Sequence, residues 1–295
     1  MTGILLAHLS DLHLPSKLSI ARFERIMAKL AELSVEHLVV TGDITDLDLS
    51  EQVEYAQSVR DILLDYGYRD PTRVTIVPGN HDLHGITGMF TAPDADTRRN
   101  LELFFQLFGR FLRRKSRSPR FPIVKRVKHL TLYCLNSITR PPGWLTLRYR
   151  LKGGQLRSLQ NAFRHSPEPD RQRVVVLHHH PYRIRLRHVR HFRFADWIED
   201  AFLWLPLNGW KMLVRTCIEH GVRYIIHGHS HSSPMVGFSD SDLVALGQGR
   251  TGHGEFSHYR LNGDSSARIR GQLTADEVVM AEEPLRPVFM VSDWR

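Results

Sequence analysis

Five short apolar segments recur along the chain, at residues 4–9, 35–40, 74–77, 174–177 and 222–226. They are rich in Val, Leu and Ile and are too short for ordinary helices. Gly, Asp or His follows each of them within a few residues. This pattern predicts five buried β-strands, each of which ends at a turn.

A helical period separates the first three predicted strands. Apolar residues recur at three- and four-residue spacing within residues 19–33 and 51–66, with Ser19 and Ser50 at the expected N-cap positions. This alternation of strand and helix predicts βαβ units, whose right-handed crossovers produce parallel strands.

Later segments mix helices and strands. We predict a helix over residues 97–112, strands over 121–127 and 130–135 that could pair as a hairpin, a helix over 153–163, and one or two helices within 194–219 that break near Pro206 and Gly209. Beyond residue 235 the pattern favours short strands, including a hairpin of 256–261 and 267–273 around Asn262-Gly263-Asp264 and a strand at 288–291. We expect residues 1–295 to form a single domain.

Side chains that can bind metals follow all five predicted strands. In sheets of largely parallel strands, ligands bind outside the carboxyl ends, so these side chains can meet in one crevice. Carboxylate, amide and imidazole donors gathered in one place indicate a metal site. In chain order the motifs are Asp11-Leu12-His13, Gly42-Asp43, Gly79-Asn80-His81-Asp82, His178-His179-His180-Pro181 and Gly228-His229-Ser230-His231.

Each motif is common by itself, but the ordered set resembles the calcineurin-like metallophosphoesterase family. The resemblance implies a four-layer α/β/β/α sandwich, with two central mixed sheets flanked by helices, and hydrolysis of phosphoesters by a pair of metal ions. The opening segment, residues 8–14, is most similar to the bacterial class III cyclic-nucleotide phosphodiesterases. That likeness implies a phosphodiesterase that acts on 3',5'-cyclic nucleotides.

The resemblance also assigns metal ligands. One ion would be held by Asp11, His13, Asp43 and His231, and the other by Asp43, Asn80, His179 and His229. His179 is chosen because the family places this ligand two residues before a proline. Two cations roughly 3.5 to 4 Å apart need an anionic bridge such as Asp43 to offset their repulsion. Manganese is our first choice for the two divalent ions, with iron, zinc or cobalt as alternatives.

His81 and Asp46 are the predicted catalytic residues. His81 is not needed as a ligand, so it would contact the phosphoryl group and protonate the leaving oxygen, as the resemblance also implies. Asp46 would orient His81, with Asp82 as the alternative, while the structural interpretation of Asp46 is a helix or turn cap. The expected reaction is in-line attack by a hydroxide held between the metals, without a covalent intermediate.

The net charge of +9 is concentrated in two segments, residues 110–128 and 183–193, of which the first contains no acidic residue. Such segments favour anionic partners: the phosphoester substrate, nucleic acid or an acidic membrane surface. Solvated loops are the simpler interpretation. There is no signal-like or membrane-spanning run, and two cysteines, Cys134 and Cys217, predict reduced thiols. We therefore expect a cytoplasmic protein, with peripheral association at the inner membrane surface as an option.

Residues 182–210 form a basic and aromatic insert. This insert could be a lid over the site, or an ordinary helix pair that covers a sheet. It motivates an alternative activity, hydrolysis of UDP-2,3-diacylglucosamine in lipid A synthesis, although that branch commonly carries Arg where this chain has His81. The alternative from another class is a non-catalytic scaffold that binds nucleic acid or membrane.

The segment Gly247-Gln248-Gly249-Arg250-Thr251-Gly252 matches the letters of the dinucleotide-binding fingerprint. A strand-like segment follows it, whereas nucleotide binding requires a helix at that position. We therefore expect a flexible turn here.

Overall fold

Two mixed β-sheets pack face to face in the structure, a computed structural model that describes residues 3–88, 94–112, 120–138, 151, 153–165, 170–183, 207–231, 234–249, 251–261, 266–274 and 277–294. The first sheet contains β1 (Ile4–Leu9), β2 (His37–Val40), β3 (Val74–Ile76), β10 (Glu255–Leu261), β11 (Ala267–Leu273) and β12 (Val278–Pro284). Its spatial order is β12-β11-β10-β1-β2-β3.

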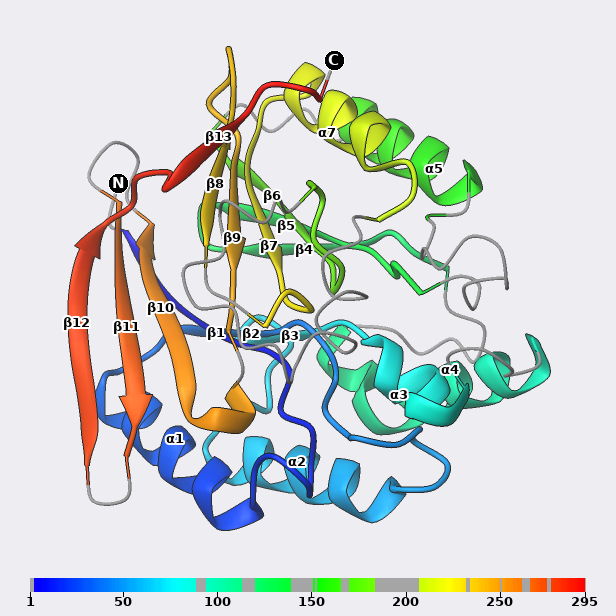
Figure 1. Cartoon of the computed structure of the whole chain (residues 1–295), viewed down its shortest axis with the longest axis vertical. Helices are drawn as coiled ribbons and strands as arrows, with labels where there is room; N and C mark the ends of the chain where they lie inside the picture. Colours follow the sequence, from blue (N-terminus) through cyan, green and yellow to red (C-terminus); the bar gives the residue numbers. More distant parts are fainter. Residues whose placement is uncertain are drawn as a thin grey trace, which may run out of the picture.

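The second sheet contains β4 (Ile123–Val127), β5 (Leu130–Cys134), β6 (Gln172–Val176), β7 (Val222–His227), β8 (Met235–Phe238), β9 (Val244–Gly247) and β13 (Phe289–Val291). Its order is β13-β8-β9-β7-β6-β5-β4. Helices α1 (Ile20–Glu32) and α2 (Val53–Asp65) cover the outer side of the first sheet, and α5 (Gly153–His165) and α7 (Trp210–Glu219) cover that of the second (Figure 1). The predicted four-layer α/β/β/α sandwich is confirmed.

The five predicted strands are present, but they are divided between the sheets. β1, β2 and β3 run parallel in the first sheet, and β6 and β7 run parallel in the second. The motifs that follow these strands therefore come from both sheets, and they meet where His178 Nδ1 lies 2.6 Å from Thr41 O. The predicted hairpins are also present as antiparallel pairs, β4 with β5 and β10 with β11.

The two predicted N-caps have different outcomes. The Ser19 side chain accepts a hydrogen bond from the backbone N–H of Arg22 at 3.3 Å, so it caps α1 as predicted. Ser50 does not cap α2, because its hydroxyl donates to Asp48 Oδ1 at 2.6 Å and the N-cap position is Gln52. The Gln52 side chain instead accepts from the backbone N–H groups of residues 46 and 47, which fixes the loop that follows the second metal motif.

Two elements differ from the sequence prediction. Helix α3 (Asn80–Gly88) begins within a metal motif and was not predicted, and α4 (Asp94–Phe108) then leads into the 3-10 turn η1 (Gly109–Leu112). Strand β12 was also not predicted. The turn at 262–264, most of the 182–210 insert and residues 113–119 of the first basic segment lie outside the described residues.

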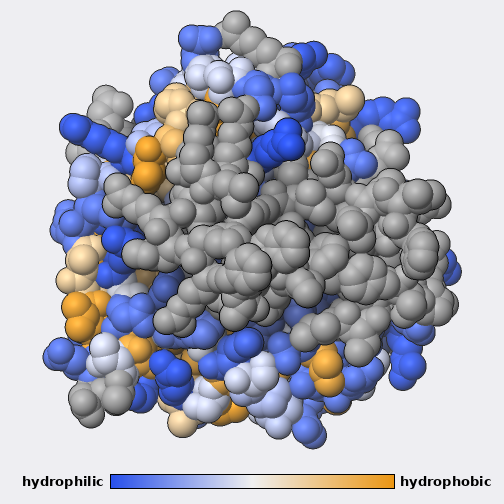
Figure 2. Space-filling model, viewed as in Figure 1, coloured by the Kyte–Doolittle hydropathy of each residue, from blue (hydrophilic) through white to orange (hydrophobic). Residues whose placement is uncertain are grey.

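Cys134 and Cys217 are free and buried, as predicted. Among the described residues, no helix combines the length and the hydrophobicity that a membrane span requires. Hydrophilic residues predominate among the described atoms on the face shown in Figure 2, where apolar atoms form small separate patches.

Candidate metal centre

Two glycines allow the loops after β2 and β3 to touch. Gly42 has a φ of +87°, and a Cβ atom on it would lie 2.2 Å from the backbone nitrogen of Gly79. A Cβ atom on Gly79 would lie 2.1 Å from Asp43 Oδ1. Neither position can therefore accept a side chain, and the close approach places Asp43 directly beside the motif that begins at Gly79.

Five of the predicted ligands have a left-handed backbone, which is uncommon for residues other than glycine. Such a conformation costs about 1 kcal/mol or more at each position, so surrounding contacts must hold it. The backbone N–H of Asp11 donates to Gly42 O at 3.1 Å, and that of His13 donates to Asp43 O at 3.0 Å. The five residues and their φ angles are Asp11 (55°), His13 (48°), Asp43 (51°), His229 (64°) and His231 (47°).

The first cluster consists of Asp11, His13 and His231, whose candidate ligand atoms lie within 4.8 Å of one another. His231 Nε2 is 3.3 Å from Asp11 Oδ1, and His13 Nε2 is 3.9 Å from Asp11 Oδ1 and 4.0 Å from Asp43 Oδ2. His13 Nε2 is buried and has no hydrogen-bond partner among the described residues. Atoms at these separations can each lie about 2.1 Å from one cation, so the cluster fits a metal ion.

Charge interactions keep the carboxylates of Asp11 and Asp43 ionised. Burial opposes ionisation, but the hydrogen bond and charge of His231 lower the pKa of Asp11. Burial likewise opposes the ionisation of Asp43, and the charges of His178 and His81 hold its pKa well below the usual range. Two buried carboxylates that remain anionic are the donors that a divalent cation requires.

The second cluster contains His178, His179 and His229, whose candidate ligand atoms also lie within 4.8 Å of one another. His178 Nε2 lies 2.9 Å from Asn80 Oδ1 and 3.3 Å from Asp43 Oδ2. Although burial disfavours its charged form, the Asp43 carboxylate raises the pKa of His178 to about 9. Asp43 therefore lies within 4.0 Å of a histidine from each cluster, a position from which its carboxylate could bridge two metal ions.

Sequence reasoning selected His179 and treated His178 as a neighbour, but the structure brings both to the second cluster. The His178 ring is anchored by Nδ1, which lies 2.6 Å from the backbone oxygen of Thr41. The His179 ring is anchored by its own Nδ1, which lies 2.8 Å from Ser137 Oγ. Such contacts to the second ring nitrogen are typical of metal-binding histidines.

A signal for His178 was present in the sequence. Side chains alternate along a strand, and Val174 and Val176 of β6 face the core that the two sheets share. Val175 and Leu177 pack in the other core cluster, which includes residues of α5 and α7. If the alternation continues for one more residue, the His178 side chain lies on the same face as Val174 and Val176, toward the crevice that contains the metal motifs.

The predicted pair of His81 and Asp46 is in contact, but through a different atom. His81 Nδ1 lies 2.7 Å from the backbone oxygen of Asp46. The Asp46 carboxylate instead lies 3.5 Å from His13 Nδ1, and the nearby imidazole lowers the pKa of Asp46. The expected carboxylate and imidazole pair is thus corrected: the Asp46 carboxylate supports a predicted metal ligand, and its carbonyl orients His81.

Asp82 does not orient His81 either. Its buried carboxylate accepts hydrogen bonds from the backbone N–H groups of Asp43 at 3.0 Å, Ile44 at 2.8 Å, Thr45 at 3.3 Å and Gly79 at 2.8 Å. Burial and the Asp43 charge raise the pKa of Asp82 to about 6. Asp82 therefore joins the loops after β2 and β3, a role that sequence reasoning did not predict.

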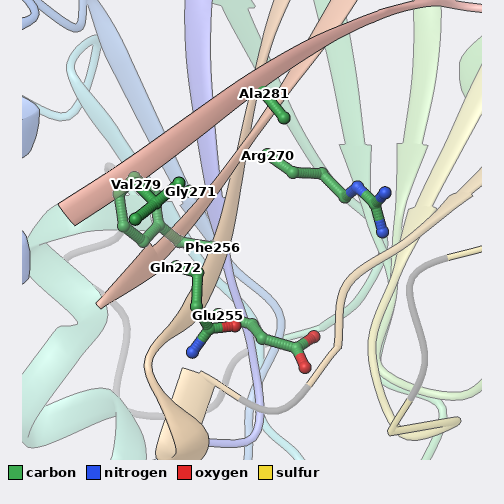
Figure 3. A pocket seen from close by; sticks show the side chains of 7 residues that line it. All are labelled: Glu255, Phe256, Arg270, Gly271, Gln272, Val279 and Ala281. Atoms are coloured by element: carbon green, nitrogen blue, oxygen red, sulfur yellow. The ribbon is translucent and has the colours of Figure 1, made fainter. Parts of the chain in front are cut away.

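A separate hollow of about 250 Å³ lies on β10, β11 and β12 (Figure 3). None of the predicted metal ligands lines it; its lining residues are Glu255, Phe256, Arg270, Gly271, Gln272, Val279 and Ala281. This hollow is distinct from the candidate metal centre.

The arrangement of these motifs on two packed sheets agrees with comparisons to known proteins. A family model described as calcineurin-like phosphoesterase matches residues 4–233, which is most of the chain. The chain therefore belongs to the calcineurin-like phosphoesterase family. Among curated proteins, none matches it significantly.

Solved structures share the fold at low sequence identity. A dimetal phosphatase from Danio rerio is 12% identical, with a TM-score of 0.58, and the match covers 94% of this chain and 98% of that one. GAP50, described as the anchor in the inner membrane complex of Plasmodium, is also 12% identical, with a TM-score of 0.53 and coverage of 97% and 90%. At this identity the likeness shows the fold alone.

Proposed function

We propose that this protein is a phosphodiesterase that uses two divalent metal ions joined by Asp43. The observation that supports the proposal is the position of the Asp43 carboxylate, which lies 4.0 Å from His13 Nε2 on one side and 3.3 Å from His178 Nε2 on the other. The membership in a phosphoesterase family and the absence of cysteine from both clusters agree with a catalytic centre of nitrogen and oxygen donors.

The side chains divide into two ligand sets in this proposal. The first ion would be held by Asp11, His13, Asp43 and His231, and the second by Asp43, Asn80, His229 and a histidine that follows β6. Both His178 and His179 are candidates for that last position. When bound, the two cations would lower the pKa of a shared water and neutralise charge on the phosphoryl oxygens. Mixed carboxylate, amide and imidazole donors suit manganese, our first choice.

His81 is the side chain that would transfer a proton to the leaving oxygen of the ester. Its backbone N–H donates to Asp43 Oδ1 at 2.8 Å, so the residue is fixed next to the bridge. A carbonyl oxygen only accepts hydrogen bonds, so the contact with Asp46 O places a hydrogen on Nδ1. The remaining ring nitrogen, Nε2, would exchange a proton with the leaving oxygen of the ester.

The proposed substrate class is 3',5'-cyclic nucleotides. The segment formed by residues 8–14 supports this choice, because it resembles the opening motif of cyclic-nucleotide phosphodiesterases. The basic segments would add attraction for anionic substrates or an acidic membrane surface, which is compatible with a cytoplasmic location near the inner membrane. Among their described residues, Lys125 is buried. The exposed basic residues are Arg110, Arg120, Arg126, Lys128 and Arg183.

Metal removal provides the first test. We expect the purified protein to hydrolyse bis(p-nitrophenyl) phosphate with added manganese, to lose activity after chelation and dialysis, and to regain it when manganese returns. A panel of cyclic nucleotides, UDP-diacylglucosamine, glycerophosphodiesters and nucleic acid then ranks the substrates. Negligible hydrolysis of every compound, with manganese shown to be bound, would favour a non-catalytic scaffold.

A further inference from the structure

The connection between β9 and β10 lies against the first metal-ligand loop. This connection spans residues 248–254 and contains the 3-10 turn η4 (Thr251–His253), beyond residues 4–233 that match the family model. Because β9 belongs to the second sheet and β10 to the first, the chain crosses here from one sheet to the other (Figure 1). It is the segment whose glycine pattern matches the letters of a nucleotide-binding fingerprint.

Thr251 forms a pair of hydrogen bonds with Ser10, the residue before Asp11. The backbone N–H of Ser10 donates to Thr251 Oγ1 at 3.0 Å, and the backbone N–H of Thr251 donates to Ser10 O at 3.0 Å. The backbone N–H of Gly252 then donates to Asp11 O at 3.0 Å. Thr251 is fully buried, so water does not replace these partners when one is removed.

The other end of the connection contacts the strand that leads to the carboxy-terminal histidines. The backbone N–H of buried Gln248 donates to His227 O at 3.0 Å. Gly228 follows His227 and packs directly on the first loop, since a Cβ atom on Gly228 would lie 1.8 Å from Ser10 Oγ. The connection therefore contacts the chain immediately before both motifs that supply the first cluster.

Packing explains the last glycine of the 247–252 pattern. A Cβ atom on Gly252 would lie 2.9 Å from Leu12 O and 3.1 Å from Asp11 O. The turn predicted from the sequence is present, but buried hydrogen bonds fix it, which differs from the flexible turn that we expected. Because Gly252 has no side chain, the turn can pack closely against the loop that contains Asp11.

We propose that Thr251 is a positioning residue for the first metal ion. Asp11 and His13 have left-handed backbones, and Gly42 O and Asp43 O hold the loop from one side. Thr251 and Gly252 hold it from the opposite side, so that the Asp11 carboxylate and the His13 imidazole converge. The inference rests on the proposed function only in that both need this cluster to bind a metal ion.

The test is calorimetric titration of metal-free protein with manganese, which requires no turnover. Wild type is expected to show two binding events, and Asp11→Asn identifies the event that belongs to the first cluster. Thr251→Val keeps the branched shape but leaves the Ser10 N–H without its acceptor. We expect this variant to weaken the manganese affinity of the first event about tenfold and to leave the second event unchanged. Tenfold is the lower end of the loss seen when a residue that supports a metal ligand is removed. Thr251→Ser keeps the hydroxyl and should bind as wild type does.

Thr274→Val is the matched control, because Thr274 Oγ1 also accepts a backbone hydrogen bond, from Glu277 N at 3.1 Å, but is exposed. It should leave both binding events unchanged. If Thr251→Val does not fold, as circular dichroism would show, Gly252→Ala tests the same contact and should weaken the same event.

An equal change in both events, no change in either event, or a Thr251→Ser variant that behaves like Thr251→Val would overturn the inference. Failure of the proposed function is distinguishable. In that case wild type binds manganese with the predicted dependence on Thr251 and hydrolyses no phosphodiester.

Discussion

Asp43→Asn is expected to lower kcat/KM for bis(p-nitrophenyl) phosphate by about a thousandfold or more at saturating manganese. The substitution keeps the shape of the side chain and an oxygen that can accept from the N–H of His81, but it removes the negative charge between the clusters. Charge stabilisation by bound metals is worth several kcal/mol, and each 1.36 kcal/mol corresponds to about a tenfold change in rate. Because Asp43 contacts both clusters, the variant should also bind less manganese per chain.

Steady-state kinetics and elemental analysis of the same protein samples check this prediction. Asp61→Asn is a suitable control, because Asp61 is exposed on α2 and forms an ion pair with Arg60 at 2.8 Å. It should change neither quantity. A rate for Asp43→Asn within about tenfold of wild type, at full metal occupancy, would show that the shared carboxylate is not required.

His81→Ala is expected to lower kcat by about a hundredfold to ten-thousandfold on a cyclic nucleotide, the usual range for loss of a general acid. The effect should be much smaller on bis(p-nitrophenyl) phosphate, because p-nitrophenolate leaves without protonation. Metal content should stay at the wild-type level, since His81 is not among the proposed ligands. The comparison of the two substrates separates proton transfer from general damage to the site.

His165→Ala is the matched control, because His165 is exposed at the end of α5, where its Nδ1 lies 2.8 Å from Asn161 O. Its rates should equal those of wild type on both substrates. Equal losses on both substrates for His81→Ala would instead assign His81 a structural role or a role in binding the phosphoryl group.

Much of the fold could be predicted because hydrophobic period and chain order are local signals. The apolar runs before Asp11, Asp43 and Asn80 all became strands of one sheet, and Ser19 caps α1. Helix α3 escaped prediction because its first residues carry the site motif and lack an apolar stripe. Strand β12 escaped because its residues are mostly exposed and show no clean alternation.

The candidate site could be predicted as a set of residues but not as a set of contacts. Which atom of Asp46 faces His81 depends on the path of the loop after Asp43, and that path is fixed by Asp82 and Gln52. The role of Thr251 depends on contact between residues 241 positions apart, which no local pattern encodes. For His178, by contrast, the alternation along β6 was a sufficient local signal that its side chain faces the site. His179 was chosen in its place because it stands two residues before a proline.

The proposed chemistry requires two metal ions that share the Asp43 carboxylate. Anomalous diffraction at the manganese edge, from crystals grown with manganese, would locate both ions. We predict two peaks about 3.5 to 4 Å apart on either side of Asp43, one beside Asp11 and His231, the other beside Asn80 and either His178 or His179. A single peak, or no peak, among these residues in fully loaded crystals would rule out a metal pair bridged by Asp43.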